Sequence, residues 1–384
     1  MPRSHTVMSA RPNPASMLGC LLSSFGVEVD PKSVGRYRIQ ARIAAGGMGE
    51  VFLASVETMP GVLRPVALKL VRPELAGQPG FAQLFVEEVR VAMSLSHANV
   101  VQAFDVGQID ARWFLAMEYV DGLDLSALLS RGPLPLGLSL LVAIEALKGL
   151  DYAHRRRGAD GAPLAIVHRD VSPGNLLLSR EGEVKVADFG VAKSTLRDVG
   201  SVIGTLKGKI PYMPPEQVKG GAVDRRADLY ALGAVLYEMI AGRRLFEGDG
   251  AALIPKILAG PGQALLGLES RVPPELVRVL KRVLAPDVDI RHGTGAQLRE
   301  ELERFAHAER LYLSSSELAS HVEEALADPR HSDRPASSSP PGVPVVTTPA
   351  AAGGFDALLG RELRRVDDGG AHSVYTTRSG LDDE

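Results

Sequence analysis

Several kinds of residue are scarce in this chain of 384 residues, and each scarcity excludes a class of protein. The single cysteine, Cys20, excludes a framework of internal disulfide bonds and is compatible with a reducing compartment. The formal net charge is only −3, so no global positive field recruits nucleic acid or an anionic membrane. Hydrophobic residues still make up 45% of the chain, which is enough to bury a core.

Long uncharged hydrophobic runs are also missing. The most apolar stretch, residues 136–150, contains Glu145 and Lys148 and is shorter than the ~18–20 apolar residues that span a bilayer. Its apolar residues recur at helical spacing, which indicates a buried core helix. We therefore expect no membrane span, and we expect a cytoplasmic protein.

Composition divides the chain into three zones. Residues 1–34 are spotted with Pro, Ser and Arg and have no sustained period, which is typical of a disordered extension. Residues 35–308 alternate strand-like and helix-like patterns. Residues 309–384 are expected to form a C-terminal tail, largely a disordered linker, with Pro/Ser/Ala/Gly-rich sequence from about 330 and a possible short helix at 355–370.

The middle zone changes character near residue 120. Before that point short strand-like segments dominate, around one helix expected at 80–96. After it, helices are expected at 124–130, 136–154, 224–242, 273–284 and 295–306. This order predicts an α+β fold of two lobes, a small β-rich N-lobe (35–119) and a larger helical C-lobe (120–308), with a cleft between them.

A glycine-rich turn separates the first two expected strands, in "IAAGGMGEV" (43–51). Glycines let backbone N–H groups approach phosphates, although any tight hairpin also uses glycine. In the strand "VALKL" (66–70), Lys69 interrupts an apolar run, and a lysine there is costly to bury unless it is paired. A solvated edge position is the alternative. The following helix offers Glu87 and Glu88, and the spacing to residues 96–99 favours Glu88 as the partner.

Acidic and amide side chains cluster in "IVHRDVSPGNLLLS" (166–179) and "VKVADFGVAK" (184–193). Asp170, Asn175 and Asp188 form an oxygen-ligand set that suits Mg²⁺ and a hydroxyl substrate. An Asp-Phe-Gly triplet can arise by chance in a turn. Its position 18 residues after Asp170 (188 − 170), across an expected hairpin, is not easily chance.

Taken in order, these motifs resemble the bacterial, eukaryotic-like (Hanks-type) serine/threonine protein kinases over residues 35–308. The resemblance implies ATP and Mg²⁺ as cofactors and transfer of the γ-phosphoryl group to Ser or Thr hydroxyls of protein substrates, with autophosphorylation in the activation segment. Pro173 follows the Ser/Thr-type pattern of the catalytic loop. The alternative is a pseudokinase scaffold without turnover. A decayed site would be expected to lose at least one of the motif residues, and here all are present.

The resemblance also implies a role for each motif residue. Lys69 contacts the α- and β-phosphates and pairs with Glu88, and Asp170 accepts the proton of the substrate hydroxyl. Asn175 and Asp188 hold Mg²⁺. Met117 is the gatekeeper and Glu118–Val120 form the hinge. The residues implied around the nucleotide are Ile43, Ala44, Gly46, Gly47, Gly49, Val51, Ala67, Lys69, Met117, Glu118, Val120 and Leu177.

Landmarks in the C-lobe follow the same resemblance. Glu216, in "MPPE" (213–216), is expected to pair with Arg291, and Asp228 is expected to anchor the catalytic-loop backbone. Arg169 precedes the catalytic Asp, which implies switching by a phosphate in the activation segment. The candidate acceptors there are Ser194, Thr195, Ser201 and Thr205.

Three positions depart from the family pattern. Ala44 replaces the first loop glycine, Ser172 replaces the catalytic-loop lysine, and Lys209 stands where an activation-segment threonine is usual. One hypothesis is an exchange: Lys209 supplies the missing cation beside Asp170, and the Ser172 hydroxyl braces Asp170 in return. The alternative is that each position drifted separately and that Lys209 points to solvent.

Overall fold

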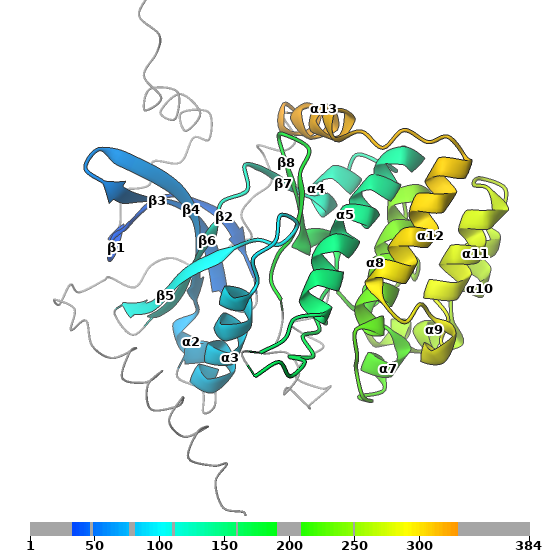
Figure 1. The fold of residues 1–384 in the computed structure, drawn as a ribbon, viewed down its shortest axis with the longest axis horizontal. Coiled ribbons are helices and arrows are strands. Elements are labelled where there is room, and N and C mark those ends of the chain that lie inside the picture. Colours follow the sequence, from blue (N-terminus) through cyan, green and yellow to red (C-terminus); the bar gives the residue numbers. More distant parts are fainter. Residues whose placement is uncertain are drawn as a thin grey trace, which may run out of the picture.

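The structure, a computed structural model, describes residues 33–46, 49–76, 81–109, 112–158, 160–189, 209–248 and 250–328. Within these ranges a sheet-based lobe, blue and cyan in Figure 1, stands beside a larger helical lobe in green and yellow. The expected two-lobed α+β fold is confirmed. No helix in the described ranges is long and apolar enough to cross a membrane.

The N-lobe is one antiparallel sheet of six strands, in the order β1-β2-β3-β4-β6-β5. Its strands are β1 (Ser33–Val34), β2 (Tyr37–Ala45), β3 (Gly49–Met59), β4 (Val62–Val71), β5 (Ala103–Ile109) and β6 (Arg112–Glu118). Successive side chains of a strand point to opposite faces, so each face has its own core. Tyr37, Leu68 and Phe114 fill one core. Phe85 of helix α3 (Phe81–Ser94) joins Trp113 and Leu115 in the other, and the short helix α2 (Pro73–Ala76) packs against this second core.

The C-lobe is built around two helices that are buried nearly all round. Its elements are β7 (Gly122–Asp124), α4 (Leu125–Leu129), α5 (Leu136–His154), β8 (Leu176–Ser179), β9 (Val184–Val186), α7 (Pro215–Val218), α8 (Arg226–Ala241), α9 (Leu253–Ala259), α10 (Gly262–Leu266), α11 (Pro274–Val283) and α12 (Gly295–Ala308). Helix α5, the most apolar stretch of the sequence, packs against α8, α12 and β9. It is the buried core helix that the spacing predicted, because an all-round apolar helix must bury every face.

The structure corrects the expected end of the folded domain. We expected the domain to stop at 308 and residues 309–384 to be largely disordered, yet α13 (Ser315–Leu326) packs over α4, β7 and β8. It is the orange helix at the top of Figure 1. Leu318, Val322 and Ala325 recur at helical spacing and are buried, so the helix gains stability from an apolar face that sequence reading overlooked. The expectations for 1–32 and 329–384 lie outside the described residues.

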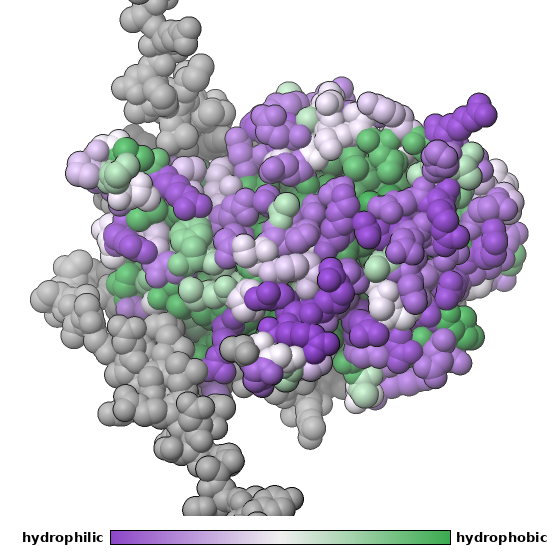
Figure 2. Space-filling view, viewed as in Figure 1, coloured by the Kyte–Doolittle hydropathy of each residue, from purple (hydrophilic) through white to green (hydrophobic). Residues whose placement is uncertain are grey.

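Polar side chains cover most of the helical lobe on the face shown in Figure 2, and apolar residues lie there in separate groups. Scattered exposed apolar residues are normal on soluble proteins.

Candidate active site

Strand register places the N-lobe candidates on one face of the sheet. Val51 pairs with Lys69, Lys69 with Leu115, and Ala67 with Met117. Directly opposed residues share a face, and so do residues two apart on one strand. The resemblance implies that Val51, Ala67 and Leu177 enclose the adenine ring. The same face of the sheet therefore carries the lysine, the predicted gatekeeper and two of these three residues, Val51 and Ala67.

The glycine-rich turn closes the end of the β2–β3 hairpin. The Gly46 amide donates to the Gly49 carbonyl at 2.8 Å, and a Cβ at Gly46 would meet nothing closer than that carbonyl at 4.0 Å. A Cβ at Gly49 would instead lie 2.0 Å from the Leu70 carbonyl oxygen of β4. Gly49 is thus required by strand packing, whereas Gly46 leaves open space beside the backbone. Gly47 lies outside the described residues, and Ile43 and Ala44 are exposed.

Lys69 is the buried cation of this wall. It is 8% exposed, and its Nζ lies 3.0 Å from Asp188 Oδ1. Sequence reasoning paired Lys69 with Glu88 instead. The backbone of Glu88 belongs to α3, but its side chain lies outside the described residues, so that pairing stays a prediction. The ion pair to Asp188 joins the N-lobe sheet to the C-lobe. Asp188 itself has a left-handed backbone (φ 57°), a conformation found mostly where surrounding structure enforces it.

Asp228 of α8 holds the backbone of the catalytic loop. Its carboxylate accepts hydrogen bonds from the amides of His168 and Arg169, each at 2.8 Å, and faces His154 Nε2 at 2.7 Å. Asp228 is 1% exposed, and Arg169 has a left-handed backbone (φ 63°). The expected anchor is confirmed. Buried hydrogen bonds to a charged group are strong, so this loop has one well-defined conformation.

His168 connects the catalytic loop to the segment of Asp188. Its Nδ1 accepts from the Asp170 amide at 3.2 Å, and its Nε2 lies 2.9 Å from the Ala187 carbonyl. Nδ1 is therefore unprotonated and Nε2 donates, which makes the ring neutral. The ring also packs on Phe189, with centroids 4.6 Å apart. Sequence reasoning did not single out His168 or His154. The signal for His168 was its place two residues before Asp170.

Asp170 and Asn175 are joined directly. Asn175 Nδ2 donates to the Asp170 carbonyl at 2.7 Å and to Asp170 Oδ2 at 2.9 Å. Because its nitrogen is committed to Asp170, the amide oxygen of Asn175 is the atom that can ligate a cation. The Ala187 amide in turn donates to the Asn175 carbonyl at 2.9 Å, which ties this pair to the chain leading into Asp188.

The two unusual positions behave differently. Lys209 lies against Asp170, with its Nζ bonded to Oδ2, as the exchange hypothesis required. Ser172 is 4% exposed, and its hydroxyl has no hydrogen bond within the described residues. Asn175, not Ser172, braces Asp170. The exchange is therefore one-sided.

The donor set fits Mg²⁺ held together with a nucleotide. The described part of the chain contains no cluster of three or more His, Cys, Asp or Glu side chains able to hold a metal alone. One carboxylate (Asp188) and one amide oxygen (Asn175) form a hard, incomplete set of oxygen ligands. Mg²⁺ is commonly bound in this way, with substrate phosphates and water completing its octahedron.

The hinge candidates lie where β6 passes to the C-lobe. The Glu118 amide donates to the Gln102 carbonyl at 2.8 Å, and its carboxylate pairs with Lys185 of β9 at 2.9 Å. Val120 lies between β6 and β7, and Leu177 lies on β8, both partly buried. The third adenine-enclosing candidate, Leu177, thus comes from the C-lobe.

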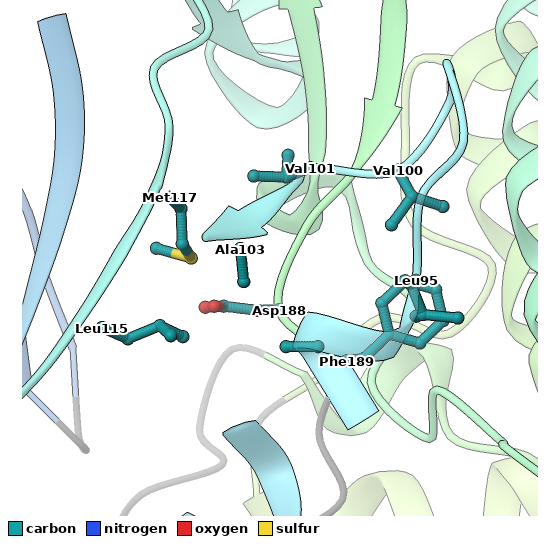
Figure 3. Close-up of a pocket in the computed structure, with 9 residues that line it drawn as sticks. Leu95, Val100, Val101, Ala103, Leu115, Met117, Asp188 and Phe189 are labelled. Atoms are coloured by element: carbon teal, nitrogen blue, oxygen red, sulfur yellow. The ribbon is translucent and has the colours of Figure 1, made fainter. Parts of the chain in front are cut away.

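A pocket lies behind Met117, between α3 and the sheet. Its lining residues are Ala92, Leu95, Val100, Val101, Ala103, Leu115, Met117, Asp188 and Phe189. Figure 3 shows Met117, Leu115 and Asp188 gathered around it. It shares Met117 and Asp188 with the expected nucleotide site but none of the adenine-enclosing candidates. Ala92 and Ala103 contribute only small side chains to its lining.

The end of the activation segment is fixed by the ion pair that the resemblance implied. Arg291 binds Glu216 through two bonds of 2.8 and 2.9 Å, donates to the Ala285 carbonyl at 2.7 Å, and stacks over Tyr230 at 4.7 Å. The predicted pairing of Glu216 with Arg291 is confirmed. The four candidate phosphorylation sites between 194 and 205 lie outside the described residues.

Comparison with known proteins agrees with this geometry. The protein kinase domain family matches residues 37–302. The chain is 39% identical over 277 residues to the tyrosine-protein kinase MasK of Myxococcus xanthus, covering 71% of this chain and 43% of that protein. It is 32% identical over 279 residues to the serine/threonine-protein kinase PrkC of Bacillus subtilis, covering 72% and 41%.

The crystal structure of the Mycobacterium tuberculosis PknI kinase domain is similar as well. It aligns with a TM-score of 0.53 at 27% identity and covers 73% of this chain and 100% of that domain. The chain spans roughly two fifths of the length of the curated relatives named above. The family match covers the fold, the catalytic loop and the Asp188 segment together, and the chain therefore belongs to the protein kinase family, in its bacterial Hanks-type serine/threonine branch.

Proposed function

We propose that this protein transfers the γ-phosphoryl group of Mg·ATP to hydroxyl groups of proteins, chiefly of Ser and Thr. The observation that carries the proposal is the arrangement of Lys69, Asp188, Asn175 and Asp170, linked through the cleft by contacts of 2.9–3.0 Å. A scaffold that only binds partners has no need for this complete set.

The chemistry assigned to these residues is mainly positioning and neutralisation of charge. Lys69 holds phosphate oxygens from the N-lobe side, and Asp188 and the amide oxygen of Asn175 hold the metal. Bound Mg²⁺ supplies positive charge to the phosphates. Asp170 orients the acceptor hydroxyl and takes its proton, while Asn175 fixes the Asp170 carboxylate. The buried hydrogen bonds that Asp228 accepts from the amides of the catalytic loop hold the loop in position next to Asp170.

The acceptor residue is a second question, because relatives of both kinds are similar to this chain. PrkC is named a serine/threonine kinase and MasK a tyrosine kinase. Pro173 in the catalytic loop supports Ser/Thr selectivity. Ser172 replaces the catalytic-loop lysine that usually marks serine/threonine kinases, and Lys209 replaces the usual activation-segment threonine. Tyrosine is therefore the second candidate acceptor.

We propose the cytoplasm as the site of action, because ATP is available there and a chain with one cysteine suits a reducing compartment. The partners we propose are protein substrates, with no role for nucleic acid, given the formal net charge of −3.

The test is incubation of the full chain with Mg·ATP and a generic protein substrate, followed by mapping of phosphorylated residues. We expect phosphoserine and phosphothreonine on the wild type and none on Asp170→Asn, which keeps the shape of the side chain. Phosphotyrosine alone would establish the second candidate. Equal signals from the wild type and Asp170→Asn would overturn the proposed function.

A further inference from the structure

The activation segment returns to the described structure at Lys209, directly beside the catalytic loop. The residues that follow form a tight turn, Ile210–Tyr212, in which Ile210 and Tyr212 are each 6% exposed. The Tyr212 hydroxyl donates to Glu238 of α8 at 2.6 Å, and its amide donates to the Lys209 carbonyl at 3.1 Å. The backbone that presents Lys209 is thus fixed to the C-lobe core, although a lysine side chain is intrinsically mobile.

The ammonium of Lys209 lies on the carboxylate that serves as the proposed base. Its Nζ is bonded to Asp170 Oδ2, the same oxygen that accepts from Asn175. The Asp170 side chain is 4% exposed and that of Lys209 is 35% exposed, so a nearly buried anion meets a cation that still reaches water. A carboxylate accepts about four hydrogen bonds, so an acceptor hydroxyl can join these two donors.

Phosphoryl transfer creates a demand for a cation at this place. The acceptor hydroxyl must lie beside Asp170 while the transferring group carries negative charge toward the same carboxylate. Charges of the same sign repel strongly in a water-poor site, and a fixed cation between them is worth most there. Lys69 stands on the opposite wall and is paired with Asp188. Position 172, which would supply this cation by the family pattern, carries a buried serine.

We infer that Lys209 supplies the cation that neutralises the transferring phosphoryl group beside Asp170, so that in this protein the charge is delivered by the activation segment and not by the catalytic loop. This inference rests on the proposed function. In the step itself, the bond between the γ-phosphorus and its bridging oxygen breaks with ADP as the leaving group. A bond forms from the acceptor oxygen to that phosphorus, and the hydroxyl proton passes to Asp170. Lys209 keeps its protons throughout.

The placement has a consequence for regulation. A lysine in the catalytic loop is always present, because buried bonds to Asp228 fix that loop. Lys209 instead reaches Asp170 only when the end of the activation segment is seated on the C-lobe. The transfer charge is thereby coupled to the conformation of the segment.

A double-mutant cycle in transfer rate tests this assignment. Lys209→Thr should lower kcat about 100-fold, the usual cost of losing one charge-stabilising group, and leave the KM for ATP within about threefold. Ser172→Lys alone should also lower kcat, because it brings two cations together. Ser172→Lys combined with Lys209→Thr should recover at least about tenfold over Lys209→Thr, because the cation returns from the loop side.

Ser172 is buried, so Ser172→Lys could disturb the packing of the catalytic loop. A second pair of variants therefore tests Lys209 without any change at position 172. Lys209→Arg retains a cation and should keep more of the rate than Lys209→Met, which has similar length and no charge. Lys219→Thr, an exposed lysine after α7, is the matched control and should be unchanged. Melting temperatures of the Lys209 variants separate a loss of rate from a loss of stability, because the nearly buried Asp170 carboxylate loses its cationic partner in Lys209→Thr and Lys209→Met but not in Lys209→Arg.

The outcomes separate cleanly. A wild-type protein without transfer activity overturns the proposed function and this inference with it. An active wild type with unchanged kcat in Lys209→Thr and Lys209→Met overturns only the role of Lys209. A faster Lys209→Thr overturns it too, because the ion pair would then be an inhibitory contact over Asp170. Strictly additive effects in the cycle would mean that Lys209 does not replace a loop cation.

Discussion

The catalytic-loop wall of the cleft and the strand wall that carries Lys69 are fixed in different ways. The loop is held within one lobe, by hydrogen bonds that two of its backbone amides donate to Asp228 and by the neutral ring of His168. The strand wall contacts the opposite lobe through Lys69, whose partner Asp188 is 40% exposed, and a pocket separates α3 from Phe189. The base is therefore built into the C-lobe, whereas the phosphate-binding lysine depends on how the lobes meet.

The largest expected effect comes from breaking the C-lobe wall. Asp228→Asn replaces one carboxylate oxygen with an NH₂ group that faces a donor, which leaves buried polar groups unpaired. We expect a loss of about 3–5 kcal/mol in the free energy of unfolding and loss of phosphoryl transfer. Thermal melting and the transfer assay measure the two effects.

Asp224→Asn is the matched control, because Asp224 also pairs with a cation but its side chain is 51% exposed. Surface pairs contribute little, so its melting temperature should stay close to the wild type. If both variants melted alike, the buried bonds of Asp228 would not fix the loop.

On the strand wall the same kind of change should affect activity and spare stability. Lys69→Met removes the cation and leaves in β4 an unbranched apolar side chain of similar length. Asp188 remains solvated after the loss, since 40% of its side chain is exposed. We expect kcat to fall about 100- to 1,000-fold, which is the usual effect of removing one charge-stabilising group from an active site.

Melting of Lys69→Met should stay close to the wild type, and Lys148→Met, which removes a partly exposed lysine paired with Glu145, should leave both properties unchanged. Retention of most of the autophosphorylation by Lys69→Met would show that this strand is not the phosphate site.

Local patterns predicted the elements of both walls, whereas the long-range contacts between them were only partly predictable. The helical spacing of 136–154 and 224–242 matches α5 and α8 closely, because these helices are nearly all apolar. Family resemblance supplied the pair of Glu216 and Arg291. Nothing local indicated that Lys69 meets Asp188, 119 residues later.

The helix α13 was missed for a related reason. Its apolar face is short, and burying that face stabilises the helix only because segments distant in the sequence form a surface against which it packs. Arg180, after β8, binds Glu323 of α13 with bonds of 2.7 and 2.8 Å and also contacts Asp121 beside the hinge at 3.2 Å. Gly182 approaches α13 so closely that a Cβ there would lie 2.0 Å from the Ser315 carbonyl oxygen. Only the folded C-lobe reveals this contact.

Helix α13 packs over β7, next to the hinge that joins the two walls. Leu318 lies on the inner face of α13 and is fully buried, so Leu318→Ala should lower the free energy of unfolding by about 2–5 kcal/mol. A chain that ends at 310 lacks the helix and should melt lower than one that ends at 328. The sequence alone predicted a domain that ends at 308, for which the two chains would melt alike.

Glu317→Ala, on the exposed side of the same helix, is the control for Leu318→Ala. Identical melting of the chains ending at 310 and 328 would mean that α13 contributes no stability to the C-lobe.

The smallest expected effect lies at the junction of the lobes, at His97. Its ring stacks on Tyr152 of α5, with centroids 4.9 Å apart, and its Nδ1 accepts from the Asn99 amide at 3.0 Å. Burial lowers the pKa of His97 below its ordinary value, although the nearby Glu145 carboxylate acts in the opposite direction. The folded protein therefore binds fewer protons than the unfolded chain as the pH approaches about 6.5 from above. The stability that His97 contributes is present above that pH and is lost as the pH falls below it.

His97→Asn retains an acceptor for the backbone amide and cannot titrate, so it should melt with a weaker dependence on pH between 7.5 and 5.5 than the wild type. His292 also has a pKa lowered by burial, but it is present in both proteins, so the difference between the two melting profiles isolates His97. Parallel profiles would show that protonation of His97 does not change the stability of the folded protein.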